Sequence, residues 1–115
     1  MPRDEVTLVD IAQACRSILD FIRGLDRESF LEDLKTRSAT LHQLLIVGEA
    51  TKRLSLDLRA RHPEIPWSEM AGMRDVLIHG YDQVDLEEVW KTASVDIPDV
   101  LARVESLSGK GGGTP

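Results

Sequence analysis

Cysteine, aromatic residues and long apolar runs are all scarce in this chain. The single cysteine among its 115 residues, Cys15, excludes an internal disulfide and fits a reducing compartment. No apolar run approaches the length of a membrane span, and residues 1–5 lack the pattern of a signal peptide. We therefore expect a cytoplasmic protein with no membrane partner.

Positive charge is also in short supply. The chain has 14 Lys and Arg against 20 Asp and Glu, which gives a formal net charge of −6. This balance argues against broad, nonspecific binding to nucleic acid, which depends on an excess of basic residues. It leaves room for a local basic cleft.

Helical patterns dominate what the sequence does contain. Apolar residues recur at helical spacing along most of the chain, and no segment alternates apolar and polar residues as a half-buried strand does. The helices expected from this spacing cover residues 5–24, 27–34, 36–61, 67–79 and a final stretch from 85. Asp85 and Glu88 resemble a capping box for that last helix, and Pro98 should kink or restart it.

The fold expected from these elements is all-α. It is an up-and-down four-helix bundle with an optional extra short helix. Residues 1–108 would form one domain, which is large enough to bury a core without disulfides or metals. The Gly-rich tail at 109–115 is expected to be disordered.

The segment from Arg74 to Tyr81 carries the most chemistry. It gathers a guanidinium, a carboxylate, an imidazole and a phenol into eight consecutive residues. Arginine donates in parallel to two phosphate oxygens, and histidine moves protons near neutral pH. In a helix, Asp75 could hydrogen-bond His79 four residues on and favour the protonated ring. These residues indicate phosphate binding or phosphodiester chemistry; the alternative is a solvated helix cap with Tyr81 at the edge of the core.

The helix over residues 36–61 contributes further candidates. Gly48 in its interior suggests that a neighbouring helix, or a partner chain, approaches closely. Glu49 could orient Arg74 or His79 in a shared cleft, or be an ordinary surface carboxylate. Lys52 and Arg53 are candidate RNA-binding residues; the alternative is a solvated helix face.

No metal and no cofactor are expected. His42 and Glu49 lie seven residues apart on one helical face, and the spacing supplies no third ligand. Gly109-Lys110 is followed by Gly111 rather than by Ser or Thr, and no strand precedes it, which argues against a phosphate loop. Cys15 lies on an apolar stripe and is expected in the core.

Arg74-x-x-x-x-His79-x-Tyr81 resembles the motif of HEPN-domain proteins, and specifically of the HepT type. The resemblance covers residues 40–100 and includes several flanking blocks in the same order. These blocks are Gln43 with Gly48-Glu49-Ala50, Ile65-Pro66-Trp67, Gly72-Met73-Arg74, Val84-Asp85, Val89-Trp90 and Asp96-Ile97-Pro98. The short motif alone is weakly specific, whereas its combination with these blocks is strongly so.

The resemblance implies a specific biology. Members of this type are metal-independent ribonuclease toxins of prokaryotic type VII toxin–antitoxin pairs, and they act as homodimers whose two motifs line one cleft. The cognate antitoxin is a minimal nucleotidyltransferase (MntA-like) that silences the toxin by transferring AMP to the motif tyrosine. In this sequence that tyrosine is Tyr81.

The same resemblance implies roles for the residues of the segment. His79 would be the general acid or base in attack of an RNA 2′-hydroxyl on its neighbouring phosphate, and Arg74 would stabilise the transition state. Position 75 is commonly Asn in such proteins and is Asp75 here, which adds negative charge or holds His79 protonated. The alternative function is a non-catalytic, dimeric subunit that binds a nucleotide or a nucleotidyltransferase partner.

Overall fold

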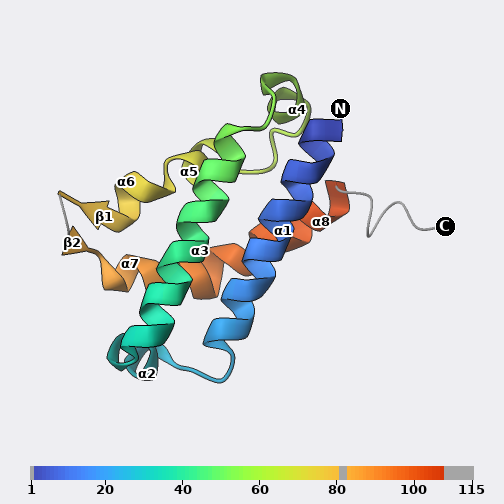
Figure 1. Ribbon diagram of the computed structural model, residues 1–115. Helices are drawn as coiled ribbons and strands as arrows, with labels where there is room; N and C mark the ends of the chain where they lie inside the picture. Colours follow the sequence, from blue (N-terminus) through green and yellow to red (C-terminus); the bar gives the residue numbers. More distant parts are fainter. Residues whose placement is uncertain (1, 81–82, 108–115) are drawn as a thin grey trace.

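The computed structural model describes residues 2–80 and 83–107. Figure 1 shows α1 (Pro2–Ile22) and α3 (Leu34–Lys52) lying side by side, and α8 (Ile97–Leu107) packs against α1. The core lies between these elements, and its apolar residues include Ile11, Leu44 and Val104. The all-α helical bundle predicted from the sequence is confirmed.

Helix α1 buries the stripe that its spacing predicts. Leu8, Ile11, Cys15 and Ile18 are all 3% exposed or less. The helix ends at Ile22, and Gly24 follows with a φ of +79°, a conformation that glycine adopts without strain. Helix α2 (Arg27–Glu32) follows, capped by Asp26, whose carboxylate accepts from the Ser29 N–H.

The single helix predicted over residues 36–61 is wrong. Helix α3 ends at Lys52, and a separate α4 (Leu56–Arg61) begins after Ser55. Asp4 at the start of α1 accepts hydrogen bonds from the Ser55 N–H at 3.0 Å and from its hydroxyl at 2.7 Å. The Ser55 hydroxyl in turn accepts from the Leu58 N–H, so this cap starts a new helix there.

The helix predicted over residues 67–79 is also wrong. The segment forms two short helices, α5 (Trp67–Ala71) and α6 (Met73–Leu77), separated by Gly72. Strand β1 (Ile78–His79) then pairs antiparallel with β2 (Gln83–Val84), although no strand was expected. The helix stops because the Leu77 carbonyl accepts from the Asp85 N–H at 2.7 Å instead of continuing the helical pattern.

The last helical run continues through Pro98. It consists of α7 (Leu86–Lys91), a π-helical turn η1 (Thr92–Asp96) and α8. The Ile97 N–H donates to the Thr92 carbonyl, the i+5 pattern of a π-helix. The irregularity expected at Pro98, which has no N–H, therefore takes the form of this wider turn.

The capping box predicted at the start of α7 is half right. The Asp85 carboxylate accepts from the Glu88 N–H at 3.1 Å. The reciprocal bond is missing, because the Asp85 N–H donates to Leu77 and the Glu88 carboxylate accepts from the Thr92 hydroxyl.

Gly48 explains how α3 meets α5 and α6. A Cβ at this position would lie 3.1 Å from the Met70 carbonyl oxygen and 3.6 Å from the Met73 Cβ. The close helix approach expected there is thus present within the chain. Within residues 2–80 and 83–107, no helix combines the length and the apolar character needed to cross a membrane. The tail at 109–115 lies outside the described residues, so the domain bounds stay a prediction.

Candidate functional site

Arg74 is presented by α6. Met73 and Leu77 are buried and anchor this short helix to the core, at 7% and 0% exposure. Arg74 and Asp75 follow Met73 by about 100° and 200° around the helix axis, so they project away from the core. Both are exposed, and the Arg74 side chain has no hydrogen bond or ion pair with any other described residue.

His79 lies on the hairpin rather than on a helix. It is exposed, pairs with Gln83 across the two strands, and precedes Gly80, whose φ of +73° turns the chain. Because the helix has already ended at Leu77, the predicted contact between Asp75 and His79 loses its geometric basis. No hydrogen bond joins these two described side chains, so that interpretation is wrong.

The change from helix to strand alters how Arg74 and His79 relate to each other. In one continuous helix the two side chains would diverge by about 140°. Since the chain leaves the helix between them, this divergence does not apply. Tyr81 comes next after Gly80 and lies outside the described residues.

Glu49, Lys52 and Arg53 lie at the end of α3. The Glu49 carboxylate accepts from the Lys52 ammonium at 3.3 Å, in a pair whose side chains are 61% and 52% exposed. Such an exposed pair contributes little to stability. Arg53 is exposed and its side chain has no partner among the described residues.

The packing at Gly48 links these two groups of candidates. Glu49 directly follows Gly48, Arg74 directly follows Met73, and a Cβ on Gly48 would touch Met73. The backbones that carry Glu49 and Arg74 are therefore adjacent. No hydrogen bond joins Glu49 to either Arg74 or His79, and each of these three described side chains faces solvent.

Cys15 and the acidic and histidine side chains were the other chemical candidates. Burial raises the pKa of the Cys15 thiol to about 12, so it is an inert core residue, as expected. In the part of the chain that the structure describes, no three side chains of His, Cys, Asp or Glu gather into a metal-binding group.

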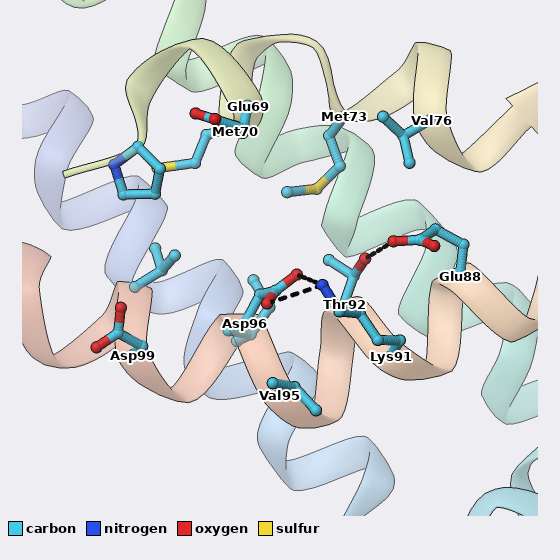
Figure 2. A pocket seen from close by; sticks show the side chains of 13 residues that line it. Glu69, Met70, Met73, Val76, Glu88, Lys91, Thr92, Val95, Asp96 and Asp99 are labelled. Carbon is cyan, nitrogen blue, oxygen red and sulfur yellow. Dashed lines mark hydrogen bonds and ion pairs between the residues drawn. The ribbon is translucent and has the colours of Figure 1, made fainter.

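Sequence reasoning missed a groove on the other side of α6. It lies between α5–α6 and α7–η1–α8, and Figure 2 shows Met73 and Val76 on one side of it and Thr92 and Asp96 on the other. Its one sequence signal is the pair Met70 and Met73, three residues apart. Neither Arg74 nor His79 lines it.

A helical bundle that exposes an arginine on α6 and a histidine on the following hairpin is compatible with a HEPN-like helical domain. The family described as "Ribonuclease HepT-like" matches residues 11–107, and the chain belongs to this family. No solved structure matches the chain significantly.

Two curated relatives illustrate the similarity. The chain is 48% identical to "Probable ribonuclease HepT" of Thermococcus cleftensis over 100 residues, which cover 87% of this chain and 91% of that protein. It is 37% identical over 109 residues to a Methanocaldococcus jannaschii protein provisionally named an RNase, covering 93% and 94% of the two chains. The predicted family is confirmed, and the residue assignments stay predictions.

Proposed function

We propose that this protein is a metal-independent endoribonuclease toxin of a type VII toxin–antitoxin pair, with Arg74 and His79 as its catalytic residues. One observation carries the proposal. On the scaffold of a ribonuclease family, α6 and β1 hold a guanidinium and an imidazole in solvent, neither engaged by another described residue. Both groups are therefore available to a phosphate.

Cleavage would use the RNA as its own nucleophile. The ribose 2′-oxygen loses its proton and bonds to the adjacent phosphorus, and the bond from phosphorus to the 5′-oxygen breaks as that oxygen takes up a proton. Because the nucleophile is already next to the phosphate, proximity is supplied without a metal. His79 moves a proton, and Arg74 stabilises the charge on the phosphorane oxygens.

A homodimer would complete the site. The reaction needs one group to accept a proton and another to donate one, and the Arg74–Tyr81 segment supplies one histidine per chain. A two-fold axis through the cleft provides a second His79 and a second Arg74. Lys52 and Arg53 would extend the basic surface for RNA. Glu49, whose carboxylate pairs with Lys52 within one chain, would be a supporting residue that orients Arg74 or His79.

Tyr81 would be the point of control. In this proposal a minimal nucleotidyltransferase antitoxin transfers AMP from ATP to the Tyr81 oxygen and releases pyrophosphate. The added phosphate and base would lie within a few residues of Arg74 and His79 in the chain. They would then exclude RNA both by volume and by charge.

A direct assay tests the nuclease. Purified protein with EDTA should degrade RNA, and His79→Ala should lower the rate at least about 100-fold, as expected for loss of a general acid or base. His42→Ala is the matched control, because His42 is an exposed histidine on α3, outside the Arg74–Tyr81 segment. Intact RNA after incubation with the wild type would overturn the proposal.

The runner-up is a dimeric binding subunit that does not cut RNA. The net charge of −6 and the exposed Asp75 beside Arg74 favour it, because both repel a polyanion. This function would be accepted if the wild type binds its nucleotidyltransferase but leaves RNA intact.

A further inference from the structure

The groove behind α6 is an apolar surface that the bundle leaves open. Its volume is about 520 Å3, within the range of ligand-binding sites. Each side contributes apolar side chains: Met70, Met73 and Val76 come from α5–α6, and Val95, Ile97 and Val100 come from η1–α8.

Two valines on opposite sides of the groove are incompletely packed. Val76 is 48% exposed and Val95 is 61% exposed, whereas Met70 and Ile97, which also line the groove, are buried. Val95 belongs to the π-helical turn, a feature that is frequent at functional sites. Methionine side chains adapt to the shape of a partner, which suits a binding surface.

The rim of the groove is acidic. It carries Glu69, Glu88, Asp96 and Asp99. Lys91 pairs with Asp96 at 3.1 Å, and Arg103 pairs with Asp99 at 2.9 Å.

Glu69 and Glu88 lack a cationic partner within residues 2–80 and 83–107, and Figure 2 shows them toward opposite ends of the groove. An occupant that brings positive charge to both ends would therefore be favoured.

We propose that this groove binds an amphipathic helix of a partner protein. Its apolar stripe would enter between α5–α6 and η1–α8, and its basic residues would face Glu69 and Glu88. This is the helix-in-groove mode of recognition. A second copy of the chain fits poorly, because a two-fold contact would set these carboxylates of one copy against the same carboxylates of the other.

The groove is separate from the proposed ribonuclease site. Val76 follows Arg74 by two residues, so the two side chains leave α6 about 160° apart around the helix axis. A helix in the groove would contact the face of α6 that points away from Arg74. Binding at the groove therefore does not depend on the proposed catalytic chemistry.

The test uses a designed probe. A synthetic helical peptide carries Leu at positions i, i+3, i+4 and i+7 and Lys elsewhere; one twin replaces Lys by Glu, and another has the same composition in scrambled order. The peptides are titrated into the isotopically labelled full chain. The Lys peptide should bind at least about tenfold more tightly than either twin, with chemical-shift changes centred on Val76 and Val95.

Exposed positions provide matched variants. Val95→Lys should weaken binding of the Lys peptide at least about tenfold, since it places an ammonium on an apolar wall that faces a basic ligand. Val6→Lys, on α1 and outside the groove, is the control, because Val6 is 60% exposed against 61% for Val95. Arg74→Ala should bind like the wild type. The double change Glu69→Lys and Glu88→Lys should reverse the preference toward the Glu peptide.

Three results would overturn the inference. The first is that the Lys peptide binds no better than its scrambled twin. The second is that Val6→Lys and Val95→Lys weaken binding equally. The third is that the wild type is a homodimer and Val95→Lys is a monomer with the same affinity for the peptide. That result would assign the groove to a second copy of the chain.

Discussion

The described arginines fall into two groups. Most donate to a carboxylate or to a backbone carbonyl, and examples are Arg16 with Glu105 and Arg59 with Thr51. Three arginine side chains make no hydrogen bond or ion pair with any described residue, those of Arg3, Arg53 and Arg74. Of these three, Arg74 is the one that lies in the segment of the motif histidine. An arginine without a structural partner is free to bind a ligand.

Replacing Arg74 by lysine tests whether RNA cleavage requires the planar guanidinium group of Arg74. Lysine keeps the charge but loses the two parallel N–H donors that match a phosphate. We expect Arg74→Lys to lower the rate of RNA cleavage at least about tenfold with an unchanged melting temperature, because the side chain is exposed. Arg53→Lys is the control and should keep most of the activity. Equal activity of Arg74→Lys and the wild type would argue against phosphate recognition by Arg74.

Asp4 is a residue that matters for stability rather than for chemistry. It is 6% exposed, and the hydrogen bonds from the Ser55 hydroxyl and N–H hold its pKa below the usual 3.8. A carboxyl group whose pKa is lowered by folding stabilises the fold at pH values above its ordinary pKa. This contribution is lost as the pH falls through the folded-state pKa.

Asp4→Ala should therefore lower the free energy of unfolding at pH 7 by about 1–3 kcal/mol, because it leaves the part-buried N–H and hydroxyl of Ser55 without their acceptor. The difference from the wild type should shrink as the pH is lowered below 3.8, the ordinary carboxyl pKa. Thermal unfolding between pH 7 and acid measures this, with the exposed Asp57→Ala as control. A gap that is constant with pH would contradict the assignment.

At the scale of elements, the hairpin after α6 determines where His79 lies. Gly80 and Gly24 both have a positive φ, +73° and +79°. At neither position would a Cβ come within 4 Å of a described residue other than the chain neighbours. Alanine at either site should therefore lower the free energy of unfolding by about 1 kcal/mol, through backbone strain alone. Only Gly80 adjoins a proposed catalytic residue.

We expect Gly80→Ala and Gly24→Ala to lower the melting temperature by similar amounts. Gly80→Ala should in addition reduce RNA cleavage at least about tenfold, because small displacements of a catalytic group are costly. Gly24→Ala should keep its activity when assayed well below its melting temperature. Equal activities of the two variants would mean that the hairpin does not position His79.

The sequence predicts the elements that depend on local pattern. The apolar stripe of α1, its end before Gly24 and the need for close packing at Gly48 are all evident from residue spacing and type. The break at Ser55 is not, because the Asp4 carboxylate that holds this cap residue lies 51 residues earlier in the chain. The hairpin cannot be predicted either, because strands of two residues each are too short to show an alternation of apolar and polar residues.

The candidate site shows the same division. The motif identifies Arg74 and His79 as residue types suited to a phosphate. It cannot reveal that Glu49 pairs with Lys52. Nor can it reveal that the backbone segments of Glu49 and Arg74 are adjacent, because this depends on the packing around Gly48. The groove behind α6 is missed for a similar reason: it exists only where α5–α6 separates from η1–α8.

At the scale of the whole molecule, the net negative charge of the protein opposes its binding to RNA, which is also negatively charged. With a net charge of −6, long-range attraction cannot supply the affinity for RNA. The proposed dimer meets this difficulty by bringing two Arg74 side chains and two His79 side chains to one cleft. Because only these few cationic groups contact phosphates, the affinity for RNA should fall with rising salt concentration by a correspondingly small slope.

The most direct measurement uses a substrate that lacks one oxygen. An RNA oligonucleotide cut at a mapped linkage is prepared again with a single 2′-deoxyribose at that linkage, and both are incubated with the protein and EDTA. Attack by the 2′-hydroxyl predicts that the RNA gives a 2′,3′-cyclic phosphate end and that the substituted linkage is not cut. Cleavage at the substituted linkage would contradict the account.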